Sequence, residues 1–355
     1  MNRAIVYTNP GTIETEVIEK PIEEPAPGEV LLRLHYSGVC HTDYGICTNV
    51  FATLPPTPKG QIGGHEGVGE VIKLGPGTTS LKLGDLVGVK WSASACLSCG
   101  NCLEGGETTC PAGTISGFMT PGTFQQYCLA PANYVTPIPR SLDPAGAAAL
   151  MCGGITVYTA LKRAEVKHGQ WVVVLGAGGG LGHLAIQYAV ALGTRVVALD
   201  VGAKEEFCLG LGARAFVDFT KFAGEEDGGE QLAARVKELT GGAGAKVVLA
   251  CSSSNKSYAQ AVGLLGFRGT LVCIGVPEGG PEPIGGANAG DMITRELKIF
   301  ALKSGNRADA KECLDIATAA GIKTRYELRP IDSLTQVFKD MEEGKINGRV
   351  VLDLR

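Results

Sequence analysis

The chain has 355 residues, of which 45% are apolar and 19% are charged, so its composition is that of a globular protein and its length is typical of about two domains. Its formal net charge of −4 offers no basic surplus for binding nucleic acid. No uninterrupted apolar run reaches the roughly 18 residues of a membrane-spanning helix, and no signal-peptide pattern opens the sequence. We therefore expect a cytoplasmic protein with neither nucleic acid nor a membrane as partner.

The sequence pattern changes once along the chain, near residue 152. Residues 1–152 hold short β-type runs such as VLLRLHYSG and GVGEVIKLG between glycines and prolines, which predicts a β-rich domain. From 153 to 294 β-branched runs alternate with helical stretches, from WVVVLG to TLVCIGV, which predicts a doubly wound parallel sheet. The tail, 295–355, contains strand-like and helix-like segments, and the acidic stretch GEEDGGE at 224–230 is predicted to be a solvated loop.

Four cysteines lie close together in CLSCGNCLEGGETTC, spaced C-x2-C-x2-C-x7-C. They are Cys96, Cys99, Cys102 and Cys110. Four thiolates suit a closed tetrahedral zinc site with a structural role. An iron–sulfur cluster remains an alternative, although the bacterial ferredoxin run has a last gap of three residues. The segment is polar and rich in glycine and has little hydrophobic core of its own, so it needs a bound metal centre to be ordered.

The stretch 171–200 is predicted to run strand, glycine-rich turn, helix and strand. The turn contains Gly176, Gly178, Gly179, Gly180, Leu181 and Gly182, in the pattern GxGxxxG. Glycines allow the backbone to approach a pyrophosphate, and the helix N-terminus offers free N–H groups to it. Asp200, at the end of the second strand, is placed to bind the adenosine ribose and to repel a 2′-phosphate, which favours NAD over NADP. Lys204 is a further candidate near that ribose.

Three further candidates for metal binding are far apart in the chain. Cys40 lies in GVCHTD, His65 in GGHEG and Cys152 in LMCGGITVY, separated by 25 and 87 residues. No local pattern joins them, and each taken alone could be a buried structural residue.

Together these motifs resemble the zinc-dependent alcohol dehydrogenases of the medium-chain dehydrogenase/reductase superfamily, most closely the yeast and fungal branch. The resemblance covers essentially the whole chain and includes CGGITVYTALK, GAGGGLG, SGNRAD and GRVVLDL. It implies an α/β fold with a GroES-like catalytic domain at 1–152, completed by 295–355, and a Rossmann NAD-binding domain at 153–294. It also implies a homo-tetramer, with a dimer as the alternative.

The resemblance also implies a role for individual residues. Cys40, His65 and Cys152 would hold a catalytic zinc, with Glu66 as a nearby or transient ligand, and the four-cysteine segment would hold a second zinc in each subunit. Asp43 would orient His65, and Thr42 would take the alcohol proton. The remaining implied residues are His41 and Arg349 at the cofactor pyrophosphate, Gly275 and Val276 at the nicotinamide, and Trp91, Tyr44 and Phe51 in the substrate pocket.

The implied activity is interconversion of a primary or secondary alcohol and its aldehyde or ketone with NAD(H). A non-catalytic dinucleotide-binding protein is disfavoured because all seven zinc ligands are kept. A zinc-free quinone reductase would lack both cysteine sets, and polyol dehydrogenases typically use glutamate in place of Cys152.

One position departs from the family pattern. The yeast-like enzymes have a proton-relay histidine two residues after the aspartate of CHTD, and this chain has Gly45 there. In one interpretation water or Tyr44 replaces the histidine. In the other, the following loop is remodelled for a bulkier substrate, and the enzyme is a carbonyl or aldehyde reductase of fungal specialised metabolism. Gly45→His is predicted to raise alcohol oxidation at neutral pH.

Overall fold

The computed structural model describes residues 1–222, 228–278 and 282–355, and these residues divide into two compact units. Unit 1 is Met1–Ile155 with Ser304–Arg355, and unit 2 is Thr156–Lys303. Residues 224–227 of the predicted solvated loop lie outside the described residues. The prediction is wrong for residues 228–230, because they begin helix α7.

Unit 1 is built on a seven-stranded sheet in the order β16-β17-β3-β4-β5-β9, with β8 paired to β3, and on two small two-stranded sheets, β1-β2 and β6-β7. The strands are β1 (Asn2–Tyr7), β2 (Thr15–Lys20), β3 (Glu29–Val39), β4 (Gly67–Leu74), β5 (Leu86–Val89), β6 (Ser92–Ser94), β7 (Thr114–Ile115), β8 (Tyr127–Pro131), β9 (Thr136–Pro137), β16 (Tyr326–Pro330) and β17 (Arg349–Asp353). The helices are α1 (His41–Cys47), α2 (Gly100–Leu103), α3 (Pro144–Ala149), α10 (Arg307–Ala320) and α11 (Leu334–Glu342).

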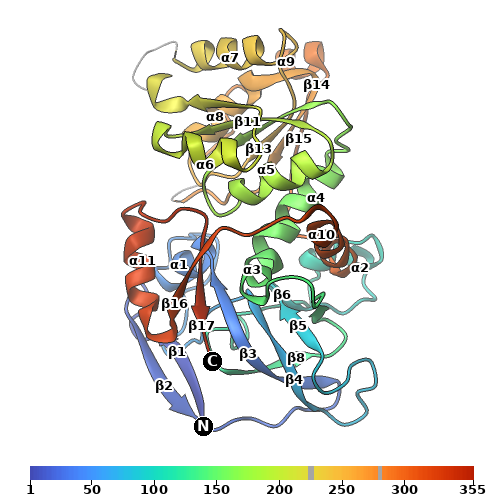
Figure 1. Ribbon diagram of the computed structural model, residues 1–355, viewed down its shortest axis with the longest axis vertical. Helices are drawn as coiled ribbons and strands as arrows, with labels where there is room; N and C mark the ends of the chain where they lie inside the picture. Colours follow the sequence, from blue (N-terminus) through green and yellow to red (C-terminus); the bar gives the residue numbers. More distant parts are fainter. Residues whose placement is uncertain (223–227, 279–281) are drawn as a thin grey trace. The chain divides into compact units, whose positions relative to one another are not determined.

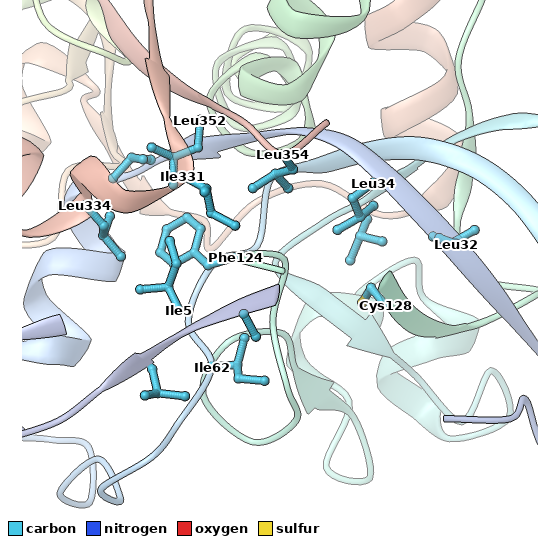
Figure 2. Close-up of a cluster of buried hydrophobic side chains, with 14 of the residues drawn as sticks. Ile5, Leu32, Leu34, Ile62, Phe124, Cys128, Ile331, Leu334, Leu352 and Leu354 are labelled. Atoms are coloured by element: carbon cyan, nitrogen blue, oxygen red, sulfur yellow. The ribbon is translucent and has the colours of Figure 1, made fainter. Parts of the chain in front are cut away.

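The C-terminal tail completes the sheet of the N-terminal part. Strand β17 pairs antiparallel with β3, with Val350 opposite Val39, and Figure 1 shows the red C-terminal strand beside the blue strand β3. Side chains from β1, β3 and the tail, such as Ile5, Leu34 and Leu352, are fully buried around Phe124 (Figure 2). This burial removes apolar surface from water and fixes β3, which ends directly before the site.

Local sequence signals explain where two helices of unit 1 begin. Asp143 caps α3 by accepting hydrogen bonds from the backbone N–H groups of Ala145 and Gly146, and Pro144 occupies the first helical position. Asn306 and Asp309 form a reciprocal capping box at the start of α10.

Helix α3 runs through a π-helical turn (Leu150–Gly154) into α4 (Ile155–Arg163). By length and composition this stretch is the one helix of the described residues that could span a membrane. However, 89% of its apolar window is buried, which is the pattern of a core helix. The π-helical turn contains Cys152, and such turns are frequent at functional sites.

Unit 2 is a six-stranded parallel sheet in the order β12-β11-β10-β13-β14-β15. In chain order this is 3-2-1-4-5-6, the Rossmann arrangement. The strands are β10 (Trp171–Leu175), β11 (Arg195–Asp200), β12 (Ala215–Asp218), β13 (Ala245–Ala250), β14 (Leu265–Cys273) and β15 (Lys298–Ala301). The helices are α5 (Gly182–Ala191), α6 (Glu205–Gly210), α7 (Gly228–Leu239), α8 (Asn255–Ala261) and α9 (Ala289–Arg295).

The division between the units differs from the predicted domain boundaries. Contacts separate the units after Ile155 and before Ser304, whereas the predicted boundaries were 152 and 295. The second boundary moves because β15 hydrogen-bonds to β14 in parallel and so belongs to the sheet of unit 2. Strand-like sequence predicted β15 itself, but nothing local indicated which sheet it would join.

Candidate active site and metal centres

Unit 1 brings four residues from three separate segments together. The metal-binding atoms of Cys40, His65, Glu66 and Cys152 all lie within 4.8 Å of one another. Cys40 is the residue between β3 and α1, His65 and Glu66 directly precede β4, and Cys152 lies in the π-helical turn. His65 and Glu66 are fully buried. The cluster therefore depends on the pairing of β3 with β4 and on the packing of the core helix, not on sequence proximity.

Asp43 fixes the orientation of the His65 ring. Its Oδ1 lies 2.8 Å from His65 Nδ1, and its Oδ2 accepts a hydrogen bond of 2.9 Å from the backbone N–H of Cys40. A carboxylate oxygen accepts hydrogen bonds, so this contact holds a ring proton on Nδ1 and leaves Nε2 as the nitrogen that can bind a metal. Nε2 is buried and has no hydrogen-bond partner among the described residues. A buried histidine nitrogen that accepts no hydrogen bond is suited to bind a metal ion.

The two sulfurs complete a donor set that fits zinc. The hydrogen bond between them lowers the pKa of the Cys40 thiol well below its ordinary value and raises the pKa of Cys152. Two cysteines and one histidine form the three-ligand set of a catalytic zinc, which leaves a position open for substrate.

Glu66 and Arg349 form a buried ion pair beside this cluster. Arg349 begins β17, and its Nη2 contacts Glu66 Oε1. Burial raises the pKa of Glu66 to about 7, even though the positive charge of Arg349 favours the carboxylate. Since the guanidinium of Arg349 is only 5% exposed and is paired with Glu66, its predicted role at the cofactor pyrophosphate stays a prediction.

Sequence reasoning missed a residue that supports this site. The hydroxyl of Tyr7 donates a hydrogen bond of 3.3 Å to the backbone carbonyl of Asp43 and holds the start of α1 against strand β1. Tyr7 is completely buried, and nothing in the local sequence linked it to residues near position 43.

The four-cysteine segment forms a second cluster. The sulfurs of Cys96, Cys99, Cys102 and Cys110 lie within 4.8 Å of one another, with pairs at 4.0 and 3.9 Å. A tetrahedron with zinc–sulfur bonds of about 2.3 Å has sulfur–sulfur edges of about 3.8 Å, so the geometry fits zinc. In a multi-iron cluster the thiolates bind different iron atoms and must lie further apart, which disfavours the iron–sulfur alternative.

This segment is tied to helix α10 by polar contacts. Glu107 accepts hydrogen bonds of 3.1 Å from both the backbone N–H and the Nε of Arg307. Asn306 donates from Nδ2 to the carbonyl of Gly105 at 3.0 Å. The SGNRAD motif of the tail therefore anchors the cysteine segment, a role that the sequence did not indicate.

In unit 2 the glycine-rich turn connects β10 to α5. A Cβ atom at Gly182 would lie 2.6 Å from the Cα of Ala177, so only glycine fits where the helix starts against the turn. Asp200 is the last residue of β11, and its Oδ2 accepts a hydrogen bond of 2.8 Å from the N–H of Gly178. A Cβ atom at Gly178 would lie 2.5 Å from Cδ of Lys204, so Lys204 lies against this turn.

The predicted nicotinamide and pocket residues have different surroundings. The carbonyl of Gly275 accepts a hydrogen bond from the hydroxyl of Tyr258, and Val276 is exposed. The Trp91 ring packs edge-on to His65 with ring centroids 5.0 Å apart, so Trp91 lies at the metal cluster.

Helix α1 carries three of the remaining predicted residues of unit 1, and Phe51 lies in the loop that follows it. Thr42 is half-buried, and His41 is exposed with its ring 5.2 Å from that of Tyr44. The hydroxyl of Tyr44 donates to Glu342 of α11 at 3.0 Å, and the ring of Phe51 lies on Gly45.

A chain with a Rossmann sheet in one unit and a buried Cys₂His cluster in a β-rich unit has the architecture of a zinc-dependent dehydrogenase. Comparisons with known proteins agree. A family model of the alcohol dehydrogenase GroES-like domain matches residues 26–140, and a model of zinc-binding dehydrogenases matches residues 180–319. The chain is 49% identical to alcohol dehydrogenase 2 of Emericella nidulans, over 99% of this chain and 97% of the relative. It is 42% identical to an alcohol dehydrogenase of Schizosaccharomyces pombe, again over 99% of this chain and 97% of the relative.

Solved structures show the same fold over the full length. An NAD-dependent alcohol dehydrogenase superposes with a TM-score of 0.88 at 26% identity, covering 99% of this chain and 100% of that one. A cinnamyl alcohol dehydrogenase from Sorghum bicolor superposes with a TM-score of 0.85 at 27% identity, covering 100% of this chain and 98% of that one. The chain belongs to the zinc-binding alcohol dehydrogenases with a GroES-like domain, and the predicted family and fold class are confirmed.

Proposed function

We propose that this protein is an NAD-dependent alcohol dehydrogenase that converts an alcohol and NAD⁺ into an aldehyde or ketone, NADH and a proton, and catalyses the reverse reaction. The observation that carries this proposal is the buried Cys40–His65–Cys152 cluster, in which His65 Nε2 has no hydrogen-bond partner in the part of the chain that the structure describes and Asp43 fixes the ring. The first unit would serve as the catalytic domain and the second as the NAD-binding domain.

Zinc held by Cys40, His65 and Cys152 would supply a Lewis acid that polarises the carbon–oxygen bond of the substrate. NAD would accept the hydride from the carbinol carbon. Thr42 lies two residues after Cys40 at the start of α1, and its hydroxyl would take the alcohol proton. Asp43 keeps His65 in the metal-binding tautomer, and the Trp91 ring forms an apolar wall beside that histidine.

A second zinc in each subunit would be held by the four-cysteine segment, where it stabilises the fold. On the NAD-binding side, Asp200 and Lys204 would bind the adenosine ribose, the glycine-rich turn the pyrophosphate, and Gly275 with Val276 the nicotinamide. Asp200 favours NAD because a 2′-phosphate would face its negative charge. His41, exposed at the start of α1, would face the pyrophosphate.

The test is a steady-state panel on zinc-loaded protein, with NADH and NADPH absorbance followed for ethanol, longer primary alcohols, benzylic and allylic alcohols and the matching aldehydes. We expect alcohol oxidation with NAD that is lost after chelation and restored by zinc. Activity unaffected by removing zinc would refute the proposal. One structural relative is named a cinnamyl alcohol dehydrogenase, so aromatic alcohols belong in the panel.

A second candidate function is reduction of a bulkier aldehyde or ketone, which is motivated by the departure of Gly45 and the following loop from the yeast-like pattern. Strong reduction of bulky aldehydes with poor turnover of ethanol would support it. We also propose a cytoplasmic homo-tetramer, by analogy with the fungal branch. A mass of dimer size by light scattering would overturn the tetramer.

A further inference from the structure

Gly45 lies inside helix α1, where glycine is an unfavourable choice. A glycine in a helix interior is less stable than alanine by about 1 kcal/mol, because it loses more backbone freedom on folding. The backbone at Gly45 does not adopt the left-handed conformation that favours glycine. The reason for glycine here must therefore be space.

The space at Gly45 is filled by an aromatic ring. A Cβ atom on Gly45 would lie 2.5 Å from Cζ and 3.2 Å from Cδ2 of the Phe51 ring, and closer still to its Cε2. Real Cβ atoms essentially never come that near to another heavy atom. Any side chain at position 45 must push this ring away, and Phe51 also packs against the hydrophobic core of unit 1.

Residues 48–57 form a loop that holds the ring in place. Asn49 has a left-handed backbone (φ 56°), which turns the chain back over α1 directly after its end. The side chain of Asn49 accepts a hydrogen bond of 2.9 Å from the N–H of Thr57, and the hydroxyl of Thr57 donates to the carbonyl of Ile46 at 2.7 Å. Both ends of the loop are thus fastened to the helix, with Phe51 between them.

We propose that Phe51 is a positioning residue that closes position 45 to any proton-carrying side chain, so that this enzyme releases the alcohol proton to water without a relay group at that position. This inference rests on the proposed function, since it concerns the proton that Thr42 would take. The hydroxyl of Tyr44 donates to Glu342 of α11, so Tyr44 could take up the alcohol proton only by passing its own proton to that carboxylate. Alcohol oxidation therefore depends on base in solution and rises with pH.

The packing corrects the sequence-based expectation that Gly45→His alone raises alcohol oxidation. The imidazole cannot enter while the Phe51 ring occupies its place. A functional relay at this position needs two changes, Gly45→His together with Phe51→Ala.

The experiment compares the parent, Gly45→His, Phe51→Ala and the double variant, all zinc-loaded. We expect the melting temperature of Gly45→His to be about 3–6 °C below that of the parent. We expect the decrease in the double variant to be smaller than the sum of the decreases in the two single variants. Gly210→His is the matched control, because Gly210 is a helical glycine and no atom of the described residues lies within 4 Å of its Cβ position. Equal melting of Gly45→His and the parent would overturn the proposal.

The second readout is the pH profile of alcohol oxidation, which a purely structural role of Phe51 would not move. We expect the double variant to exceed Phe51→Ala by roughly 3–10-fold in kcat at pH 7, less than a direct general base provides, and to converge with it above pH 9. Identical pH profiles of these two variants would overturn the proton-route part. An inactive parent would refute the proposed function and, with it, the proposed release of the proton to water. The melting temperatures of the four proteins would still test the packing of Phe51 against position 45, because they do not depend on activity.

Discussion

Replacing Asp43 with asparagine tests the logic of the metal cluster with almost no change in shape. Asp43 is 1% exposed, and its two oxygens accept from the N–H of Cys40 at 2.9 Å and contact Nδ1 of His65 at 2.8 Å. The amide oxygen of asparagine must face the backbone donor of Cys40, so its NH₂ group faces His65. Nδ1 must then accept, and the ring proton moves to Nε2, the atom that faces the metal site.

The expected loss follows from this change of tautomer. Changes to the partner of a metal-binding histidine typically weaken metal binding 10–100-fold, about 1.4–2.8 kcal/mol. In the metal-free protein a buried hydrogen bond to a carboxylate, worth about 1.5–3 kcal/mol, is replaced by one between neutral groups, worth about 0.5–1.5 kcal/mol. We therefore expect weaker zinc binding and a lower melting temperature of the metal-free chain.

The assay is a zinc titration against a competing chelator at pH 7, with melting of the metal-free protein measured in parallel. Asp85→Asn is the control, because Asp85 also accepts a backbone hydrogen bond (2.9 Å, from Lys82) but lies in a turn with no histidine. If Asp43→Asn binds zinc as tightly as the parent, Asp43 does not set the tautomer of His65 and the reasoning fails.

Three further changes test other parts of the molecule. If the four-cysteine segment holds the structural zinc that we propose, Cys102→Ser should remove one zinc per chain and lower the melting temperature without changing KM; metal analysis showing unchanged zinc would contradict this. Asp200→Ser should raise kcat/KM with NADP relative to NAD, and an unchanged ratio would show that Asp200 does not select the cofactor. Burial lowers the pKa of Lys90 from 10.5 to about 7, so the unfolded chain binds more protons between these values and the stability of the folded protein rises with pH across this window. The parent should therefore gain stability relative to Lys90→Met from pH 7 to 10 in chemical denaturation; a flat difference would mean that the Tyr134 ring, 4.0 Å away, stabilises the charge.

The sequence by itself determined the features whose chemistry is local. Four cysteines within fifteen residues can only be near one another, and a glycine-rich turn between a strand and a helix, followed by an acid at the next strand end, is a dinucleotide pattern wherever it lies. The alternation of β-type and helical runs likewise predicted the parallel sheet of unit 2, because each run is long enough to show its own period.

Tertiary structure decided what depends on contacts between distant segments. Cys40, His65 and Cys152 were joined by family resemblance and not by spacing, and the pairing of β3 with β4 and the core helix bring them together. Strand β15 joined the sheet of unit 2 because of its hydrogen bonds with β14, which its own residues do not encode. Gly45 was visible in the sequence only as a missing histidine. The fold gives the physical reason for the glycine, because the loop that follows α1 returns the Phe51 ring to the space that a side chain would need.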